Sequence, residues 1–349
     1  MRRIHQTEAH IHALLQHAGL VNSGTTYSLT VLAGGGSDRT FYRIAAGGKT
    51  FICLSAHGQR GDIRPYVSVG LFLRECDIGV PRIFAWDDVR HLVLMEDLGD
   101  NSLFTIVTHT ARRTNVVALY RRVVTALADL QLRATPHMHR CAFLRNRSFG
   151  YEALRWESDY FLECCIRQYC GIEPPNEDGL DHELHRLAAV LANEPRCFMH
   201  RDFQSTNIFL TNDEVRIIDF QTATSGLPHY DLAALLYDAY ITLDAQERAE
   251  LIDAYLSVRN QGGAEPFDRR HFVEVFMRTV IQRTMQALGA FSFLGLHKGK
   301  HEFIRFIPVA LQSLRESLER VPDYPVLTDL VDRATYVIKN NKRSARRDR

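Results

Sequence analysis

Three polar side chains at fixed intervals constrain what this chain can fold into more than any other feature. Asp202 is followed five residues later by Asn207, and Asp219 comes after two short, mostly apolar runs, 208–210 and 215–218. A polar turn separates the two runs, which is the pattern of a β-hairpin. Because a hairpin returns the chain to its starting end, the sequence predicts that Asn207 and Asp219 lie beside each other.

The residue types at these positions suit the transfer of a phosphoryl group. This reaction needs a carboxylate that accepts the proton of the acceptor hydroxyl, and oxygen ligands for Mg²⁺. We expect Asp202 to be the base and Asn207 and Asp219 to be the metal ligands. His200 and Arg201 precede Asp202 and complete the H-R-D-x-x-x-x-N loop of kinases. Each residue alone could cap a turn or end a strand, but their order favours a kinase.

The composition limits the other classes of protein. The 349 residues are 46% hydrophobic and 24% charged, which is ordinary for a globular chain. The 42 Lys and Arg residues balance 41 Asp and Glu residues, so the chain as a whole gives no case for nucleic-acid binding. No secretion signal or membrane-length apolar run is visible, and 7 cysteines without paired spacing fit a reducing compartment. We expect a cytoplasmic protein with no membrane, nucleic-acid or obligate protein partner.

The N-terminal part is predicted to be rich in β-strands. Apolar runs bounded by turn residues predict strands at 27–32, 40–44, 50–54, 82–86 and 91–95, with a helix at 65–76. The loop between the first two strands has three consecutive glycines, whose N–H groups can approach phosphate oxygens. Three glycines between strands are more commonly a plain hairpin turn, so only the downstream motif favours phosphate binding.

The residues that we expect to contact a nucleotide lie in this loop, on the strand after it, and at the end of the fifth strand. N–H groups, a hydroxyl and two guanidiniums are available to phosphate in Gly34, Gly35, Gly36, Ser37, Arg39 and Arg43. In a kinase-like protein, the backbone at Met95 and Glu96 would meet the edge of adenine. A strand end followed by a polar turn is the alternative interpretation of these last two residues.

Beyond residue 98 the pattern becomes mostly helical. Apolar stripes with helical spacing predict helices at 116–130, 151–171, 182–193, 228–236, 247–256, 272–288 and 303–318. We expect residues 1–97 to form a nucleotide-binding lobe and residues 98–338 a catalytic and substrate lobe. The basic residues 339–349 are expected to be a disordered tail, because they offer no apolar side chain to bury.

Several motifs, taken together and in order, resemble the aminoglycoside phosphotransferase and choline kinase superfamily. These motifs are Gly35-Gly36-Ser37-Asp38-Arg39 with Phe41 and Arg43, Leu94-Met95-Glu96-Asp97-Leu98-Gly99, the H-R-D loop with Asn207, Asp219-Phe220-Gln221, and Tyr230-Asp231-Leu232. The chain is most similar to bacterial cell-wall amino-sugar kinases, which phosphorylate the anomeric hydroxyl of N-acetylmuramate and N-acetylglucosamine. Residues 64–67, 154–161 and 231–238 carry this closer similarity.

The resemblance implies an α+β, two-lobed, protein-kinase-like fold with a small β-rich N-terminal lobe and a larger, mainly helical C-terminal lobe. It implies ATP with Mg²⁺ as the donor and a small-molecule sugar as the acceptor. The residues expected to contact this acceptor are Arg201, Gln221, Arg155 and Glu157.

The third predicted strand departs from the usual kinase pattern. Residues 50–55 contain no interior lysine, although most kinases place there the lysine that contacts the α- and β-phosphates. Arg43 is our choice to replace it, with Arg39 and Lys49 as the other candidates, because a guanidinium can bind phosphate through two parallel hydrogen bonds. Pairing of Arg43 with an acid on a neighbouring strand is almost as well supported. The usual helix partner of the lysine has only Glu75 as a candidate.

Two other classes of function stay open. An aminoglycoside or amino-alcohol (choline-like) kinase would need an acidic pocket, and Glu157, Asp159 and Glu163 could supply one, although Arg155 and Arg167 balance them. A catalytically impaired nucleotide-binding regulator is supported only by the missing lysine, and the complete base and metal set argues against it. The sequence does not decide which sugar or which hydroxyl is phosphorylated.

Overall fold

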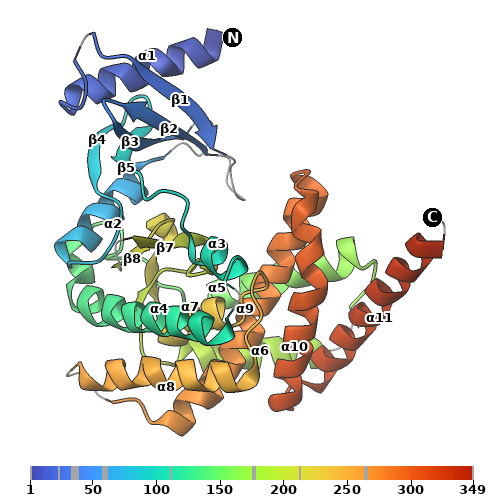
Figure 1. The fold of residues 1–349 in the computed structure, drawn as a ribbon. Coiled ribbons are helices and arrows are strands. Elements are labelled where there is room, and N and C mark those ends of the chain that lie inside the picture. Colours follow the sequence, from blue (N-terminus) through green and yellow to red (C-terminus); the bar gives the residue numbers. More distant parts are fainter. Residues whose placement is uncertain are drawn as a thin grey trace. The chain divides into compact units, whose positions relative to one another are not determined.

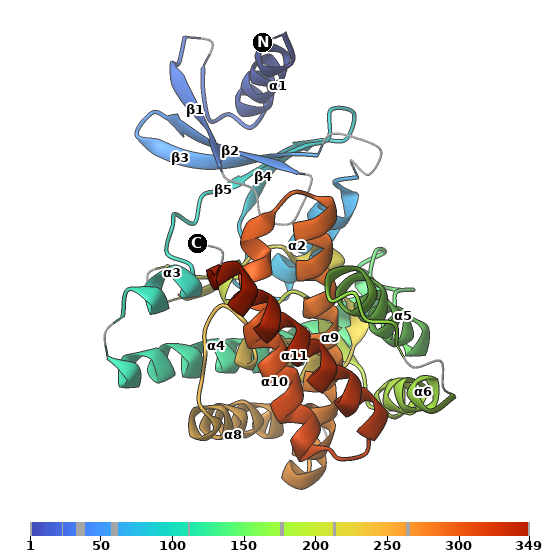
Figure 2. The same ribbon diagram turned by 90° about the vertical axis from the view of Figure 1, so that its right-hand side faces the viewer.

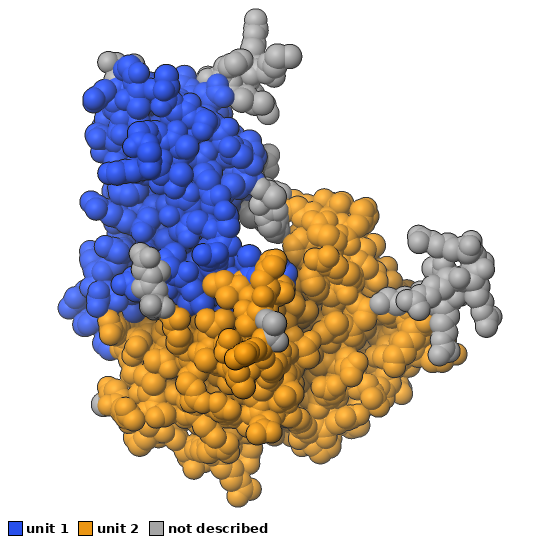
Figure 3. All heavy atoms as spheres, in the orientation of Figure 1, with its two compact units in different colours: residues 1–105, 136–146, 206–223 blue, residues 106–135, 147–205, 224–349 orange. Residues whose placement is uncertain are grey.

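The computed structural model describes residues 2–22, 24–32, 39–56, 62–110, 112–174, 178–211, 214–262 and 266–347. Figure 1 shows the elements, and Figure 3 shows the two compact units that they form. Unit 1 comprises residues 1–105, 136–146 and 206–223, and unit 2 comprises residues 106–135, 147–205 and 224–349. The units exchange segments along the chain, so they do not follow a single cut, and the predicted lobe boundary after residue 97 stays a prediction.

Unit 1 contains a five-stranded antiparallel sheet in the order β1-β2-β3-β5-β4. Its strands are β1 (Tyr27–Leu32), β2 (Thr40–Ala46), β3 (Lys49–Ser55), β4 (Ile83–Asp87) and β5 (Leu92–Glu96). All five predicted strands are therefore confirmed, with differences only at their ends. Gly47 and Gly48 both have positive φ between β2 and β3, as a tight hairpin with the natural strand twist requires.

Two helices pack on this sheet region. Helix α1 (Arg2–His17) buries Ile11 and Leu15 in one core with Ile44 and Phe51 of the sheet. Helix α2 (Arg64–Glu75) begins with a proline in its first turn, where the missing N–H costs no helical hydrogen bond. Helix α2 confirms the prediction for residues 65–76.

A short hairpin completes unit 1. Strand β7 (Ile208–Thr211) pairs with β8 (Glu214–Ile217) and confirms the predicted hairpin. The backbone N–H of Ile217 donates to the carbonyl of Gly79 at 2.7 Å. A Cβ on Gly79 would lie 2.3 Å from the carbonyl oxygen of Val215, so only glycine allows this close approach.

Unit 2 is mainly helical, as Figures 1 and 2 show. The short α3 (Leu103–Thr108) has residues in both units. The other helices of unit 2 are α4 (Arg113–Ala134), α5 (Tyr151–Phe161), α6 (Asp178–Ala192), α7 (Pro228–Leu236), α8 (Ala245–Gln261), α9 (Arg269–His297), α10 (Ile307–Arg320) and α11 (Pro325–Arg347). Helix α5 continues into a π-helix, η2 (Leu162–Tyr169). The predicted helical segments are confirmed. Helix α7 is buried along its whole length, which places it at the centre of unit 2.

Helix α11 has no counterpart among the predicted elements. Its buried residues recur with helical spacing, from Leu327 through Val331 to Ile338. Both oxygens of the Glu183 carboxylate on α6 accept its first N–H groups, those of Val326 and Leu327, each at 2.9 Å. The backbone stays helical through the basic residues as far as Arg347, so the expected disordered tail is not seen over that stretch. No helix in the described part of the chain is long and apolar enough to cross a membrane.

Candidate active site

The H-R-D loop, residues 200–205, belongs to unit 2 and follows the short strand β6 (Cys197–Met199). Strand β6 pairs with β9 (Thr224–Gly226), and the loop leaves the end of this pair. The fully buried Asp231 of α7 accepts hydrogen bonds from the backbone N–H groups of His200 (2.7 Å) and Arg201 (2.8 Å). Burial raises the pKa of Asp231 to about 6, although His200 and these N–H groups act in the opposite direction. Asp231 therefore anchors the start of the loop.

The backbone turns sharply at Arg201. Its φ is +78°, in the left-handed region that residues other than glycine seldom adopt. The N–H of Asp202 donates to Nδ1 of His200 at 3.2 Å, and the N–H of Gln204 donates to the carbonyl of Asp202 at 2.9 Å. A left-handed residue of this kind costs about 1–3 kcal/mol, so the hydrogen bonds to Asp231 must offset that strain.

A second buried acid anchors the end of the H-R-D loop. Asp238, just beyond α7, accepts hydrogen bonds from the N–H (2.9 Å) and the hydroxyl (2.6 Å) of Ser205. Its other oxygen accepts the N–H of Tyr240 at 3.0 Å. Burial raises the pKa of Asp238, and the hydrogen bonds from Ser205 oppose that change. Two acids from one segment thus fix both ends of the loop that carries Asp202.

Sequence reasoning missed these anchoring roles. In the sequence, Asp231 was part of the Tyr230-Asp231-Leu232 motif only, and in the structure it lies in the first turn of α7, a helix that no side chain caps. The signal was nevertheless present, because Asp231 and Asp238 interrupt an otherwise apolar, buried segment. Carboxylates in such a segment must find donors, and exposed loop N–H groups next to a strand end supply them.

Glu157, predicted to contact the acceptor, lies buried behind Arg201. The Tyr230 hydroxyl donates to Glu157 at 2.8 Å, and the Gln282 amide donates to its other oxygen at 3.4 Å. The guanidinium of Arg201 lies 3.7 Å from the Glu157 carboxylate and 5.0 Å from the centre of the Phe149 ring. Burial raises the pKa of Glu157 to about 7, and Arg201 opposes that rise. Glu157 is 1% exposed, so any effect on an acceptor would pass through Arg201.

The acidic side chains of α5 and of the π-helix η2 that follows it pair with arginines. Arg155 pairs with Asp159 at 3.3 Å and with Asp181 of α6 at 2.7 Å. Glu163 pairs with Arg167 at 3.2 Å. The acids considered for a cationic acceptor therefore already have cationic partners, and Arg155 is engaged as well.

The two predicted metal ligands both lie in unit 1, at the base of the β7–β8 hairpin. The N–H of Ile218 donates to the carbonyl of Asn207 at 3.0 Å, which extends the strand pairing and places Asn207 next to the residue before Asp219. Asp219 has a left-handed backbone with φ of +66°, and its side chain is 39% exposed. The Gln221 amide donates to Asp219 at 2.7 Å. Gln221 therefore orients the Asp219 carboxylate, and its expected contact with the acceptor stays a prediction.

The residue after Asp219 is anchored in the core of unit 1. The Phe220 ring lies 4.7 Å from the Tyr66 ring of α2, and the Tyr66 hydroxyl donates to the sulfur of Met95 at 3.0 Å. Burial raises the pKa of Tyr66, with a further rise from Asp219 and an opposing effect from Arg39. Met95 is buried on β5, opposite Ile52 of β3 and Ile83 of β4, and its predicted contact with adenine stays a prediction.

The predicted phosphate-binding cations have different environments. Arg39 lies 3.9 Å from the Asp219 carboxylate. Arg43 lies 2.8 Å from Asp97 and 2.9 Å from Asp100, and it also donates to the carbonyl of Gly99. Arg43 thus pairs with acids, as in the alternative interpretation, but these acids follow β5 and do not lie on a strand next to β2. The predicted Gly34, Gly35, Gly36 and Ser37 lie outside the described residues.

Glu96 connects the end of β5 to the hairpin. Its carboxylate accepts hydrogen bonds from the Arg216 guanidinium of β8 at 2.6 and 3.2 Å and from the N–H of Arg82 at 3.0 Å. Burial acts to raise the pKa of Glu96, but the Arg216 guanidinium and the N–H of Arg82 together lower that pKa below its ordinary value. Lys49 and Glu75, the remaining candidates for the missing ion pair, are both exposed.

A kinase-like phosphotransferase is the class that this fold and these residues define. Residues 28–267 match the phosphotransferase enzyme family, and the chain belongs to that family. The predicted enzyme class, a phosphotransferase that acts on an alcohol group, is confirmed.

Curated relatives cover most of the chain. The N-acetylmuramate/N-acetylglucosamine kinase of Neisseria meningitidis is 26% identical over 315 residues, which cover 87% of this chain and 91% of that protein. The protein of the same name from Pseudomonas putida is 24% identical over 311 residues, covering 87% of each chain.

Solved structures confirm the predicted fold. The choline kinase LicA from Streptococcus pneumoniae has a TM-score of 0.61 at 16% identity, with 89% of this chain and 99% of that chain covered. An ADP-bound aminoglycoside phosphotransferase, APH(2'')-Ib, has a TM-score of 0.55 at 14% identity, with 84% and 95% covered. At these identities the likeness shows the protein-kinase-like fold alone.

Proposed function

We propose that this protein is an ATP- and Mg²⁺-dependent sugar kinase that acts in the cytoplasm. It transfers the γ-phosphate of ATP to the anomeric hydroxyl of N-acetylmuramate or N-acetylglucosamine, in the recycling of cell-wall sugars. The observation that carries the proposal is the pair of buried acids, Asp231 and Asp238, that fix both ends of the loop bearing Asp202. The curated amino-sugar kinases that cover most of the chain support the choice of acceptor.

The reaction assigned to Asp202 is a proton transfer coupled to phosphoryl transfer. The acceptor hydroxyl gives its proton to the Asp202 carboxylate, and its oxygen forms a bond to the γ-phosphorus. The bond from that phosphorus to the β–γ bridging oxygen breaks, so the products are a sugar phosphate and ADP. Asp202 is half-buried in a loop fixed at both ends, which suits a base that must keep one position.

Asn207 and Asp219 fit the requirements of Mg²⁺. They offer an amide and a carboxylate oxygen, and Gln221 orients the carboxylate. The described residues contain no cluster of three or more His, Cys, Asp or Glu side chains that could hold a metal. Phosphate oxygens and water would therefore complete the coordination, as is usual for Mg²⁺ in kinases. The ion supplies neutralisation of the phosphate charge.

Arg39 and Arg43 are assigned separate tasks in nucleotide binding. Arg39 lies beside Asp219 and is the guanidinium that we assign to the phosphates in place of the missing lysine. Arg43 holds the segment 97–100 that follows Glu96, where the backbone would meet adenine. Arg201, with Glu157 behind it, is the assigned contact to the acceptor.

A substrate panel tests the proposal. The purified protein is incubated with ATP and Mg²⁺ and with either amino sugars, choline, ethanolamine or aminoglycosides, and ADP release is measured. We expect turnover with N-acetylmuramate or N-acetylglucosamine, and loss of the free reducing end in the product. Turnover of choline or an aminoglycoside without any sugar would contradict the proposal. Nucleotide binding without turnover of any acceptor would indicate a regulator instead.

A further inference from the structure

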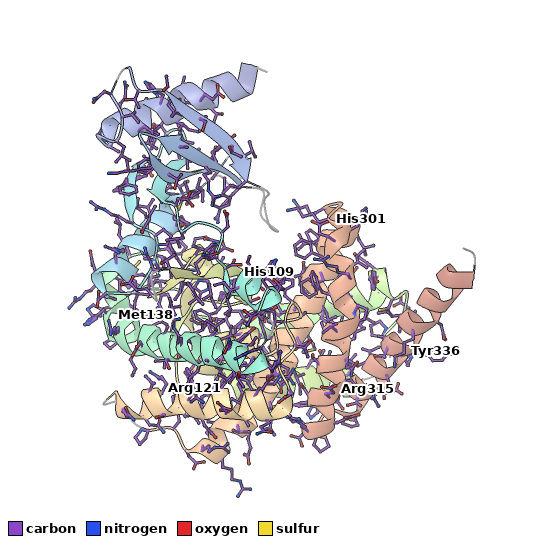
Figure 4. The ribbon with its side chains drawn as sticks, viewed as in Figure 1. His109, Arg121, Met138, His301, Arg315 and Tyr336 are labelled. Carbon is purple, nitrogen blue, oxygen red and sulfur yellow. The ribbon has the colours of Figure 1, made fainter. Side chains whose placement is uncertain are left out.

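An aromatic cluster in unit 2 gathers around Tyr240. The Tyr240 ring lies 4.6 Å from the Phe306 ring in an edge-to-face arrangement and 6.1 Å from the Phe291 ring of α9. Phe306 ends the 3₁₀-helix η5 (His301–Phe306), which lies in the turn between α9 and α10 where Figure 4 labels His301. The segment from α9 onward lies beyond the residues that match the family, 28–267, so the family match does not account for η5.

Tyr240 is tied to the H-R-D loop through one carboxylate. Asp238 accepts the N–H of Tyr240 at 3.0 Å and binds both the N–H and the hydroxyl of Ser205. Burial raises the pKa of Tyr240, and Asp238 and Asp202 raise it further, which places the phenol within the electrostatic reach of Asp202. The cluster is thus held at a set position relative to the proposed base.

Arg305 adds a cation to this cluster. Its guanidinium carbon lies 4.7 Å from the centre of the Phe306 ring, and its side chain is exposed. Arg305 makes no ion pair with any other residue that the structure describes. A guanidinium held over an aromatic ring keeps its hydrogen-bond donors available to a carboxylate ligand.

We propose that Tyr240, Phe306 and Arg305 form the subsite for an acceptor sugar that carries a carboxylate. The inference rests on the proposed function and names the acceptor within it. Aromatic surfaces contact the apolar face of the pyranose ring, the Tyr240 hydroxyl bonds a sugar hydroxyl, and Arg305 pairs with the acidic substituent. N-acetylmuramate has that substituent and N-acetylglucosamine lacks it. The same arginine disfavours a polycationic acceptor.

A second aromatic pair in unit 2 is the main alternative location for a sugar-binding subsite. Trp156 and Tyr160 of α5 are stacked with ring centres 5.0 Å apart, and Trp156 is 59% exposed. An exposed stacked pair could also receive a sugar. No hydrogen bond among the described residues ties Trp156 to the H-R-D loop, so we assign it no part in the subsite and use it as a control.

Steady-state kinetics with both sugars test the subsite. Phe306→Leu is expected to raise the KM for both sugars about threefold to tenfold, the value of one lost aromatic contact, with the KM for ATP unchanged. Arg305→Gln is expected to raise the KM for N-acetylmuramate by a similar factor and to leave that for N-acetylglucosamine unchanged. The matched control is Trp156→Leu, which removes an exposed aromatic ring of the same unit and should behave like the wild type.

Each outcome bears on one claim. An unchanged sugar KM in Phe306→Leu, or a raised sugar KM in Trp156→Leu alone, would overturn the subsite while leaving the kinase in place. Equal effects of Arg305→Gln on both sugars would overturn the role of the carboxylate. If the wild type phosphorylates neither sugar, the proposed function fails and the subsite fails with it. Because Arg305 is exposed, its variant keeps the test valid even if Phe306→Leu unfolds.

Discussion

Single buried carboxylates determine the local conformation of the proposed active site. Asp231 binds two consecutive N–H groups and so stabilises the left-handed backbone of Arg201. Asp219 has a left-handed backbone of its own, and Gln221 orients its carboxylate. Strain of this kind persists only where neighbouring bonds offset it, and here it occurs beside the two carboxylates to which we assign the chemistry.

Replacement of Asp231 tests its anchoring role. Asp231→Ala leaves two N–H groups without their acceptor and Arg201 in a strained conformation, so we expect a loss of about 2–4 kcal/mol of unfolding free energy. Chemical denaturation measures this change. Asp253→Ala is the control, because Asp253 is an exposed acid paired with Arg269, and such pairs contribute about 0–1 kcal/mol. Equal losses in the two variants would contradict the role assigned to Asp231.

The buried Glu157 predicts a pH dependence of stability. Its pKa is about 7 in the folded protein and 4.5 as the ordinary value, so the folded state binds more protons between these limits. The contribution of Glu157 is therefore fully present below about pH 4.5 and is lost as the pH rises through 7. Glu157→Gln removes this loss, and its stability relative to the wild type should rise by on the order of 3 kcal/mol across that window.

Denaturation of both proteins from pH 5 to pH 8 measures this difference. The raised pKa of Asp231 contributes to both proteins equally, so it cancels in the comparison. Parallel stability curves for Glu157→Gln and the wild type would show that burial does not raise the pKa of Glu157 in this way.

At the scale of elements, helix α7 positions the loop that carries the proposed base, and the β7–β8 hairpin positions the proposed metal ligands. Asp231 on helix α7 and Asp238, two residues after its end, are the acids that bind the H-R-D loop. The hairpin brings Asn207 next to the residue before Asp219, and the Glu96–Arg216 pair ties the hairpin to β5. The H-R-D loop with its two acids lies within unit 2 and the hairpin lies within unit 1, so variants can test each one separately.

The arginines of unit 1 give a test at this scale. Arg39→Ala should raise the KM for ATP about tenfold, because a charge-assisted contact to phosphate is lost. Arg43→Ala should change that KM less than about threefold and mainly lower stability, since its guanidinium already pairs with Asp97 and Asp100. The exposed Lys49 provides the control variant, Lys49→Ala. If Arg43→Ala raises the KM for ATP more than Arg39→Ala does, Arg43 and not Arg39 contacts the phosphates, as we expected from the sequence.

Much of the fold could be predicted from the sequence, because apolar periodicity sets which face of each element is buried. The five strands of the sheet, the hairpin and most helices of unit 2 have long or strongly alternating patterns. Strand β9 has three residues and ends in glycine, so it is too short to show a period. Helix α11 was missed because its basic end resembles a solvated tail, although Pro325 and the stripe from Leu327 to Ile338 indicate a helix.

The candidate site could be predicted only in part. Spacing predicted that Asn207 and Asp219 lie at the base of one hairpin, since a hairpin is a local structure, and the roles of Asp202, Asn207 and Asp219 stay predictions. The partners of Arg43 and the burial of Glu157 depend on contacts between residues far apart in the sequence. Periodicity carries no information about such pairs, which is why the acid pairing of Arg43 could not be chosen beforehand.

At the scale of the whole molecule, two units interleaved in the sequence divide the proposed tasks. Unit 1 contains Asn207, Asp219 and Arg39, to which we assign Mg²⁺ and phosphate, and unit 2 contains Asp202 and the proposed acceptor subsite. The family match covers parts of both units, and the helices from α9 onward lie outside it. This division predicts that nucleotide binding and acceptor activation can be lost separately.

Measurement of turnover and Mg-ATP affinity in Asp202→Asn tests the central claim most directly. The variant cannot accept the proton of the acceptor hydroxyl, but it leaves the metal and phosphate residues of unit 1 intact. We predict that kcat falls more than about tenfold, equivalent to at least roughly 1.4 kcal/mol, while the calorimetric Kd for Mg-ATP stays within about twofold of the wild type. Asp219→Ala, as the matched variant, should instead lose Mg-ATP binding. Retention of more than about a tenth of wild-type kcat in Asp202→Asn would contradict the assignment of Asp202 as the base.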